Sequence, residues 1–534
     1  MKNDNYENFK QRLANFFSRI QADKILLRLG ACLLFLAILI GVFTRIYAVF
    51  NYNQFRDDQS RDSFVYAQMH EGKWPTLGPG SSVGGYSLSP IYYYLNYIFS
   101  FGSLDPAIQA FPNSLFEFLS IPLFFYFLLL LLNGFKSGRS WFIAGFATLW
   151  WSIFFQDLIY SSMEWNPSSI PFFQMLFIVF AYKAIQESIN FKNKAQTNTT
   201  ALQVFKHSLK SFLWWFLTGL TTAILTGLHS TTVMVTPVVF GLVSIYTIWK
   251  VRLYAFPLIL SWLTILVAHI SYIQGEISRN WANTLNFIQL IQKPQPVAHT
   301  VFERIDRSLF NYLDWGNFAF FDKVNSSNIN NFFLSLILGL AVIKFKGNRL
   351  IWAILWSFWL IYSYAVSNFW SYIFPYYKFP IWLSPIIFVV VFLNFFDIKK
   401  IREWVLAVII VIFSLNSFYF NFTMSKNLLQ SRLSNQRTVI TSDMITGLKA
   451  LPENSTLCLN SFFKQPFEYL NLVYTKDKSI KITDDCSDSQ TIKLHPKFGQ
   501  NYGDLTVYPE PVLDQKQIEK IYFENQAVVF YSSK

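Results

Sequence analysis

The chain has 534 residues, of which 53% are hydrophobic, 19% are aromatic and only 14% are charged, and its mean hydropathy is positive at +0.30. This composition excludes an ordinary soluble globular protein. The formal net charge of +13 does not by itself indicate nucleic-acid binding, because the basic residues gather between long apolar segments. The chain is therefore predicted to be a membrane protein.

The N-terminal segment, residues 1–28, carries six Lys and Arg residues and precedes the first apolar run. That run begins at Leu29, continues past Ile40 and is followed by no small-residue cleavage site. A secretory signal peptide would have a shorter leader and such a site. The first apolar run is therefore predicted to stay in the protein as a membrane anchor.

Further apolar runs follow, each near the roughly 20 residues that cross about 30 Å of hydrocarbon. They predict an α-helical polytopic membrane protein with about eleven transmembrane helices. The predicted spans are residues 29–50, 113–132, 140–156, 167–187, 211–228, 231–249, 253–273, 331–345, 350–367, 375–396 and 403–420.

Basic residues orient this bundle. They fall in residues 1–28 and in every second turn between spans, whereas the turns at 157–166 and 228–230 contain no Lys or Arg. By the positive-inside rule the N-terminus is cytoplasmic, in the cell inner (plasma) membrane. Three large segments then face outward: the loops 51–112 and 274–330, and the tail 421–534. The tail has 13 basic and 12 acidic residues, so most of the net charge reports topology.

The tail alternates amphipathic patterns with short apolar stretches such as "STLCL" and "QAVVFYSS", which predicts a small α/β domain outside the membrane. Two of the three cysteines, Cys458 and Cys486, lie in it, where an oxidising compartment would allow them to pair. Cys32 lies in the first span and is expected to be a packed apolar residue. The predicted domains are thus residues 1–28, 29–420 and 421–534.

One stretch concentrates charge just past the first span: "RDDQSRD", residues 56–62. Such carboxylates are open to three interpretations: solvated loop charges, ion ligands or transport groups, or a general base. Asp57 and Asp58 follow the span so closely that they are expected near the headgroup plane. The segment after them is rich in aromatic residues and in Pro and Gly, as an interfacial element would be.

These residues carry a resemblance. The acidic pair with Arg61 three positions on, followed by "EGKWPTLGPG" and "SPIYYYL", resembles the first outer loop of glycosyltransferases of the C-type (GT-C) fold. The nearest families are the protein O-mannosyltransferases and the lipid A aminoarabinose transferases. Weaker matches are the "SSMEWNPSSIPFF" turn with Trp165 and Asn166, His229, Glu276, and the "FPYYKFPIWLSP" turn with Tyr377 and Lys378. The resemblance covers roughly residues 29–420, and the tail matches nothing we can name.

The resemblance implies that Asp58 occupies the position of the family's catalytic aspartate. Gln59 stands where many members have Glu, so Asp57 is the neighbouring carboxylate and the division of roles between the two is open. A basic residue that some relatives carry is replaced by Ser89. Phosphate binding then depends on other cations, for which the candidates are Arg61, Arg279 and Lys378.

Each candidate also has a structural interpretation. Arg61 could pair with Asp57 or Asp62, Arg279 with Glu276 one helical turn earlier, and Lys378 could extend from a span end to the interface. A single His at a helix end, such as His229, is more often structural than chemical. The Trp165–Asn166 turn could contact a sugar, but it could equally stop a helix.

The implied function is transfer of a sugar, a hexose or a pentose, from a polyprenyl-phosphate donor to an acceptor hydroxyl outside the membrane, with inversion. A phosphate leaving group needs charge stabilisation rather than a general acid, and the acceptor hydroxyl needs one general base. The acceptor class (lipid, glycan or protein) stays open. No cofactor is indicated, no metal ligands are assigned, and a divalent metal is left open.

Two alternatives remain. A transporter or flippase of lipid-linked sugars would carry charged residues or Gly/Pro breaks near the middle of its spans, often in repeated halves. Here the charges collect in the outer loops and no repeat is visible. An enzyme resembling the O-antigen ligases would share the compartment and the substrate class, but it would not predict an acidic pair directly after the first span.

Overall fold

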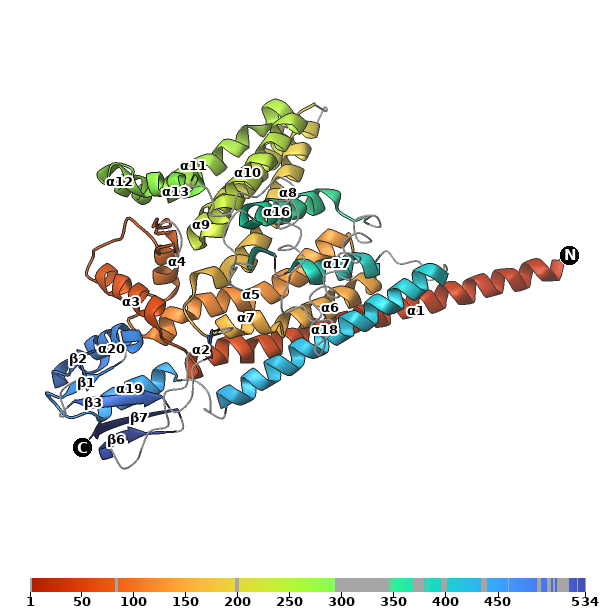
Figure 1. The fold of residues 1–534 in the computed structure, drawn as a ribbon. Coiled ribbons are helices and arrows are strands. Elements are labelled where there is room, and N and C mark those ends of the chain that lie inside the picture. The colour runs from red at the N-terminus through yellow and green to blue at the C-terminus, as the bar shows by residue number, and fades with distance from the viewer. Residues whose placement is uncertain are drawn as a thin grey trace.

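The computed structural model contains a helical bundle and a small C-terminal unit of helices and strands (Figure 1). It describes residues 2–81, 85–196, 201–292, 345, 347–367, 379–381, 383–394, 401–433, 439–459, 461–486, 491–496, 501–502, 505–506, 518–525 and 527–533. The predicted span 331–345, except for its last residue, lies outside the described residues, and so do Tyr377 and Lys378.

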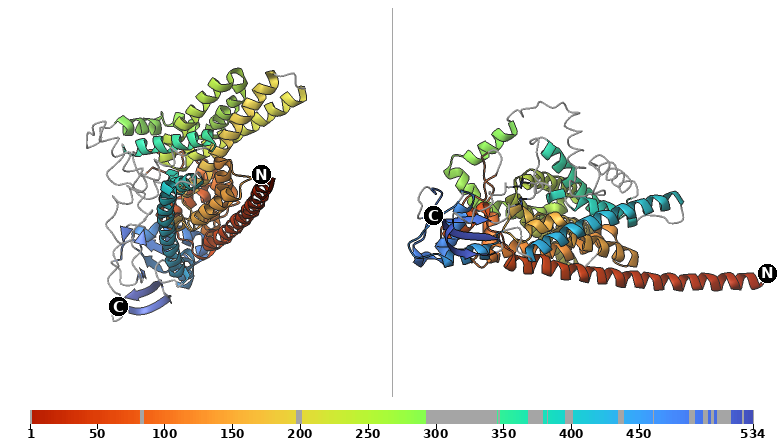
Figure 2. Two further views of the ribbon diagram at one scale, coloured as in Figure 1. Left: turned by 90° about the vertical axis from the view of Figure 1, so that its right-hand side faces the viewer. Right: turned by 60° about the horizontal axis from the view of Figure 1, so that its bottom comes forward.

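The first helix unites the basic N-terminal segment with the first span. α1 (Lys2–Gly41) passes into a π-helical turn (Val42–Tyr47) and ends in α2 (Ala48–Asn51). It forms the long rod that reaches the N-terminus in Figures 1 and 2. α1 packs on α6 (Gly138–Ser152), where a Cβ at Gly30 would lie 2.4 Å from the backbone of Trp141. Glycine at this contact lets the two helices approach closely, as small residues do in membrane bundles.

After the first span the chain forms two short helices and then the rest of the bundle. The short helices α3 (Asp57–His70) and α4 (Ile91–Phe99) belong to the loop 51–112. The remaining helices are α5 (Pro106–Leu132), α7 (Phe155–Tyr160), α8 (Ile170–Gln196), α9 (Ala201–Leu228), α10 (Ser230–Val251), α11 (Ile259–Ala268), α12 (Ile270–Ser278), α13 (Ala282–Gln292), α16 (Arg349–Ser367), α17 (Ser384–Asn394) and α18 (Ile401–Leu433), with 3₁₀ turns at Asn166–Ser169 and Arg252–Leu258.

Six helical stretches are long and apolar enough to cross a membrane. They are Asp23–Asn51, Pro106–Leu132, Asn166–Gln196, Phe205–Leu228, Ser230–Ala268 and Ala407–Arg432. Two shorter apolar helices, Arg349–Tyr362 and Phe379–Asn394, match the predicted spans near 350–367 and 375–396. The predicted span 253–273 is interrupted, because the turn Arg252–Leu258 precedes α11 and a new helix starts at Ile270. The prediction of a polytopic helical membrane protein is confirmed, although the number of spans is not.

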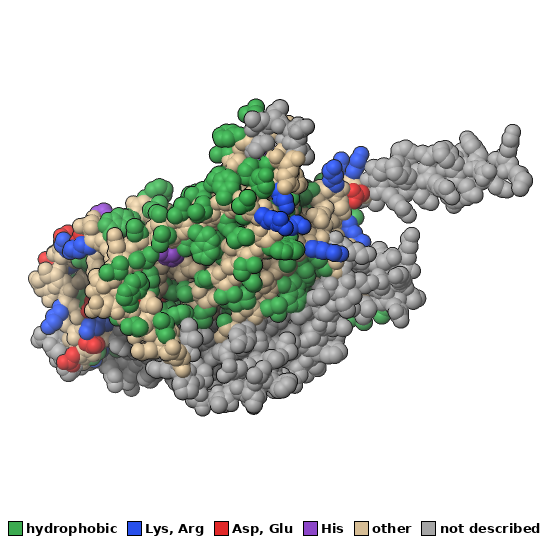
Figure 3. All heavy atoms as spheres, turned by 90° about the horizontal axis from the view of Figure 1, so that it is seen from above, with side chains coloured by type: hydrophobic (Ala, Val, Ile, Leu, Met, Phe, Trp, Pro, Cys, Tyr) green, Lys and Arg blue, Asp and Glu red, His purple; other side chains and the backbone are tan. Residues whose placement is uncertain are grey.

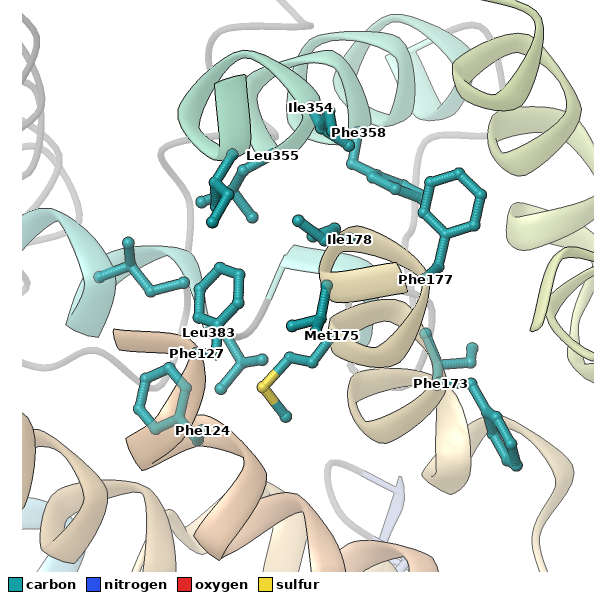
Figure 4. Close-up of a cluster of buried hydrophobic side chains, with 14 of the residues drawn as sticks. Phe124, Phe127, Phe173, Met175, Phe177, Ile178, Ile354, Leu355, Phe358 and Leu383 are labelled. Atoms are coloured by element: carbon teal, nitrogen blue, oxygen red, sulfur yellow. The ribbon is translucent and has the colours of Figure 1, made fainter. Parts of the chain in front are cut away.

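The bundle core is almost purely apolar and aromatic. Figure 4 shows side chains from α5, α8, α16 and Leu383 converging, including Phe127, Met175 and Phe358. Apolar side chains also cover the middle of the face seen in Figure 3, and Lys and Arg lie toward its two ends. A surface this apolar is the expected exterior of helices in contact with lipid.

The C-terminal unit contains a five-stranded mixed sheet in the order β2-β1-β3-β7-β6. β1 (Thr456–Cys458) pairs in parallel with β2 (Lys481–Thr483) and β3 (Ile492–Pro496), and β7 (Val528–Ser533) pairs antiparallel with β3 and β6 (Ile518–Glu524). β4 (Asn501–Tyr502) and β5 (Leu505–Thr506) form a separate pair. With α19 (Thr441–Ala450) and α20 (Ser461–Tyr474), this sheet confirms the predicted small α/β fold.

The predicted neighbourhood of the two tail cysteines is confirmed. "STLCL" and the segment before Cys486 form the adjacent strands β1 and β2, and Cys458 and Cys486 form a disulfide with Cα atoms 5.4 Å apart. The bridge closes a loop with a sequence separation of 28 residues.

Removal of this bridge is expected to destabilise the C-terminal unit. A cross-link of this loop length contributes about 3–4 kcal/mol in the chain-entropy model. We therefore expect the paired variant Cys458→Ser/Cys486→Ser to unfold its C-terminal unit at a lower temperature than the parent, measured by limited proteolysis during a thermal ramp. Cys32→Ser is the matched control and should leave the profile unchanged; equal profiles for all three proteins would contradict the expectation.

Candidate functional site

The acidic pair lies in the first turn of α3. Arg56 is the N-cap with an extended backbone, and Asp57 and Asp58 are the first two helical residues. Acidic side chains suit this position because the unpaired backbone N–H groups of a helix start carry partial positive charge. The "RDD" stretch is thus the start of a helix, separated from the end of the first span by residues 52–56.

Asp58 is accessible and paired. Half of its side-chain surface is exposed, and its Oδ1 accepts a hydrogen bond from Nη1 of Arg61 at 2.7 Å. The Nε of Arg61 also donates to Asp62 at 2.8 Å, and the buried Asp62 accepts from the Tyr93 hydroxyl at 2.8 Å. Arg61 therefore bridges an exposed carboxylate and a buried one on its own helix.

Asp57 is in a different environment from its neighbour. Burial, followed by the negative charge of Asp58, raises the pKa of Asp57 to about 6. Its Oδ1 is buried and accepts no hydrogen bond from any part of the chain that the structure describes. A carboxyl group with a pKa near 6 and an unpaired oxygen is suited to accept a proton near neutral pH.

Behind α3 lies a buried carboxyl group that the sequence analysis did not assign to the site. Glu164 accepts hydrogen bonds from the hydroxyls of Tyr66 at 2.7 Å and Tyr92 at 2.5 Å, and its backbone oxygen accepts from Gln59 at 2.7 Å. Burial raises the pKa of Glu164 well above its usual range. Glu164 belongs to the "SSMEWNP" turn of the resemblance, but that motif does not reveal its contact with α3.

The weaker candidates around this turn have structural contacts. Asn166 donates to the carbonyl of Leu228, and the Trp165 ring stacks on Tyr160 with centroids 5.9 Å apart. His229 is the N-cap of α10, where its Nδ1 accepts from the backbone N–H of Thr231 at 3.3 Å. Burial lowers the pKa of His229 to about 3, so it supplies no positive charge at neutral pH.

α13 contacts the segment between α3 and α4. Asn283 donates to the carbonyl of Ser87 at 2.8 Å, and Asn286 donates to the carbonyl of Gly85 at 2.9 Å. In α12, the fully buried Glu276 accepts from the backbone and hydroxyl of Thr284, both at 2.7 Å. The segment between α3 and α4 therefore meets α13.

Arg279 ends α12 and is only loosely paired. Its Nη2 lies 3.9 Å from the Oε1 of Glu276, and its Nη1 donates to Thr76 at 3.3 Å. Nε and Nη2 are buried and donate no hydrogen bond within the described ranges, whereas about a third of the side chain as a whole is exposed. The predicted pairing of Arg279 with Glu276 is thus present only as a long contact. Arg279 thus keeps two buried donors without a hydrogen-bond acceptor in the described ranges, whereas Arg61 uses Nε and Nη1 on Asp62 and Asp58.

The structure divides the predicted site residues into two connected groups. Asp57, Asp58 and Arg61 on α3 are linked through Gln59 to the turn that carries Trp165 and Asn166. Glu276 and Arg279 are linked through Thr76 to the segment that follows α3. Among the described residues, no group of three His, Cys, Asp or Glu side chains is placed to hold a metal ion.

Fold and site together define a polytopic helical membrane protein in which a helix with an acidic first turn, α3, follows the first span in the chain. No family model and no curated protein matches the sequence. Among solved structures, ArnT from Cupriavidus metallidurans in the apo state is similar, with 10% identity, 94% of this chain and 97% of that chain covered, and a TM-score of 0.49. The same protein bound to undecaprenyl phosphate gives 11% identity, the same coverage and a TM-score of 0.48.

The Archaeoglobus fulgidus oligosaccharyltransferase is also similar, at 14% identity and a TM-score of 0.42. The match covers 82% of this chain and 61% of the oligosaccharyltransferase. ArnT and this oligosaccharyltransferase are GT-C glycosyltransferases. Similarities this distant assign no residue of the present chain.

Proposed function

We propose that the protein is a membrane glycosyltransferase that moves a sugar from a polyprenyl-phosphate donor to an acceptor hydroxyl at the outer face of the membrane. The observation that carries the proposal is the start of α3, where two adjacent carboxyl groups follow the first span in different environments: Asp58 is exposed and paired, and Asp57 is half-buried with a raised pKa. A base at this depth can meet a donor whose lipid is held in the membrane.

In this mechanism Asp58 accepts the proton of the acceptor hydroxyl while that oxygen attacks the anomeric carbon. The new bond joins this carbon to the acceptor oxygen, and the bond to the phosphate oxygen breaks. The polyprenyl phosphate leaves with the electron pair of that bond, so its negative charge needs a cation. A single displacement of this kind inverts the anomeric configuration.

Arg279 is the better-supported cation for the leaving phosphate among the described candidates. Its Nε and Nη2 have no hydrogen-bond acceptor within the described ranges, and a guanidinium binds phosphate with two parallel N–H donors. Arg61 acts by holding the Asp58 side chain in place through the hydrogen bond at 2.7 Å. Tyr377 and Lys378 remain candidates from the sequence alone.

The proposal is tested with purified protein in lipid, given polyprenyl-phosphate sugars of different head groups and mixed envelope acceptors. We expect one donor to be consumed with release of polyprenyl phosphate and with inversion in the product. Retention of configuration, or passage of intact donor across the vesicle without cleavage, would contradict the proposal.

The raised pKa of Asp57 predicts a pH dependence of the proposed reaction, because protonation of Asp57 changes the charge directly beside the base Asp58. Because the pKa of Asp57 is raised to about 6, this group loses its proton as the pH rises through that value. We expect kcat/KM to rise with pH to a plateau above about pH 7, and Asp57→Asn to remove this step from the profile. The raised pKa also means that the folded protein binds a proton at Asp57 more tightly than the unfolded chain does. The contribution of Asp57 to the free energy of unfolding is therefore largest below about pH 4 and falls as the pH rises from about 4 to about 6. A profile with the same step in the Asn variant would assign it to another group.

We also propose a membrane orientation in which the acidic helix α3 and the C-terminal unit lie outside the cytoplasm. The positive-inside pattern places the N-terminus in the cytoplasm and Lys534 outside. An alkaline phosphatase fused after residue 534, active only outside, should therefore be active, and a fluorescent reporter that folds only in the cytoplasm should stay dark there. The reverse result would place the acidic helix on the wrong side for an external acceptor.

The transporter hypothesis keeps one specific observation in its favour, namely charge inside the spans. Arg45, Glu117 and Arg432 lie in apolar helical stretches long enough to span a membrane and are buried. Arg45 lies close to the end of the stretch Asp23–Asn51 and Arg432 is the last residue of Ala407–Arg432, so of these three only Glu117 lies near the middle of its stretch, Pro106–Leu132. One carboxyl group near the middle of a span does not by itself form the path of charged groups through the midplane that a transporter needs. The vesicle assay above separates the two functions.

A further inference from the structure

The C-terminal unit reaches into the segment that carries the acidic pair. α20 lies beside α3 in Figure 1 and packs on it. Phe55, just before α3, is buried within the apolar cluster of the C-terminal unit, together with Leu448, Phe467 and Leu470. Phe64 of α3 packs against the same cluster. The hydrophobic core of this unit is therefore completed by residues on both sides of Asp57 and Asp58.

Tyr469 of α20 makes the central contact. The centroid of its ring lies 5.5 Å from the ring centroid of Phe55. It lies 5.2 Å from the ring centroid of Phe64, in an edge-to-face arrangement. Its hydroxyl donates to the carbonyl of Leu104 at 2.8 Å and accepts from Gln109 of α5 at 3.0 Å. The side chain is fully buried. Tyr469 thus joins three parts of the molecule: the C-terminal unit, the segment around α3, and the outer end of α5.

Thr441 makes a second contact, with the chain just before the acidic pair. Its backbone N–H donates to the carbonyl of Asn53 at 2.9 Å, and its hydroxyl lies 2.6 Å from the side-chain oxygen of the same residue. Asn53 in turn donates to the carbonyl of Ser162 at 2.9 Å. The chain entering α3 is therefore held between the first residue of α19 and the turn before Glu164.

We propose that the C-terminal unit positions the acidic helix, with Tyr469 and Thr441 as positioning residues for Asp57 and Asp58. Glu164 and Gln109 hold the inner face of α3 through Tyr66 and Ser63, and the C-terminal unit holds the flanks at Asn53, Phe55 and Phe64. A base displaced by about 1 Å loses much of its effect on rate, so a fixed helix start matters for transfer. The catalytic part of this inference rests on the proposed glycosyltransferase function.

The test uses the full-length protein in lipid nanodiscs and four variants: Tyr469→Ala, Tyr469→Phe, Thr441→Val and Tyr474→Phe. Tyr474 is the matched control, because it lies on the same helix and its hydroxyl donates to Asp105 at 2.7 Å rather than to a residue of α3. The first readout is hydrogen exchange of residues 53–70, which needs no substrate. The second is the change in kcat and in the KM for the donor.

We expect Tyr469→Ala to speed exchange of residues 53–64 by about 10-fold or more, because the ring between Phe55 and Phe64 is lost. Transfer should fall about 10-fold in kcat with little change in the donor KM, as expected when the base is misplaced but donor binding persists. Tyr469→Phe keeps the ring and should restore most of both values. Tyr474→Phe should match the parent in both readouts. Unchanged exchange in Tyr469→Ala would overturn the proposal.

Unfolding of the C-terminal unit in Tyr469→Ala would be recognised by reduction of the Cys458–Cys486 bridge, followed by alkylation of both thiols, at a reductant concentration that leaves the bridge of the parent protein intact. In that case Thr441→Val decides between the outcomes, because it only replaces a hydroxyl by a methyl group. Faster hydrogen exchange of the backbone around Asn53 supports the proposal, and unchanged hydrogen exchange overturns it. If the parent transfers no sugar at all, the proposed function fails, while hydrogen exchange still decides whether the C-terminal unit holds α3.

Discussion

Asp58→Asn is expected to lower the rate of sugar transfer by about 10²-fold or more while folding and donor binding persist, because general-base catalysis is commonly worth this much. The amide keeps the shape of the side chain and can still contact Arg61, but it cannot take the proton of the acceptor hydroxyl. The measurement is single-turnover transfer at saturating donor, together with donor affinity by titration.

A matched control is Asp484→Asn in the C-terminal unit. The Asp484 side chain is 54% exposed and its Oδ1 lies 3.0 Å from Lys464, so it resembles Asp58 in exposure and in having a basic partner, but it lies far along the chain from α3. This control should transfer at the parent rate. If Asp58→Asn is near the parent and Asp57→Asn is slow, the base is Asp57. If both variants are near the parent, the acidic pair is a solvated helix start and the mechanism is wrong.

Local signals in the sequence predicted the parts of this molecule that depend on neighbours in the chain. Apolar runs of the right length indicated most of the spans, and short β-rich runs around Cys458 indicated the strand that carries it. The acidic pair was noticed because charge is rare in this chain. These predictions succeed because helix length, strand alternation and charge clusters are properties of contiguous residues.

Contacts between distant residues could not be predicted in this way. Glu164 meets Tyr66 across 98 residues, and Tyr469 meets Gln109 across 360. No local pattern marks such partners, because an aromatic residue on an amphipathic helix has the same signature whether it packs on its own domain or on another. The sequence analysis therefore named the acidic pair but neither the Glu164 contacts behind it nor the role of the tail.

Buried charge inside the bundle could not be predicted from local patterns either. The sequence analysis expected the charges to collect in the outer loops. Arg45 lies in the π-helical turn of the first span with no exposed surface, and its Nη2 lies 2.5 Å from the Oδ2 of Asp157, also fully buried. The same guanidinium donates to the carbonyl of Ser152 at 3.0 Å. Arg45 thus links the first span to the end of α6 and to α7.

Loss of one partner of this pair should be the most destabilising single change among those considered, because it leaves a buried charge uncompensated. Breaking such a pair typically costs about 3–5 kcal/mol, whereas replacing both partners by apolar residues is often neutral. We expect Arg45→Met to lower the free energy of unfolding by about that amount, and Arg45→Met/Asp157→Leu to recover most of it. The measurement is unfolding in mixed micelles followed by tryptophan fluorescence.

The exposed pair of Lys73 and Glu71, 2.9 Å apart with most of both side chains in solvent, supplies the control. Lys73→Met should leave the unfolding curve where it is, because solvent screens an exposed pair. The decisive comparison is between the single and double variants. Recovery in the double variant means that the pair acts through charge balance. A double variant as unstable as Arg45→Met would mean instead that the hydrogen bond to Ser152 and the packing of the π-helical turn hold the first span, and that Asp157 only neutralises a charge the fold already needs.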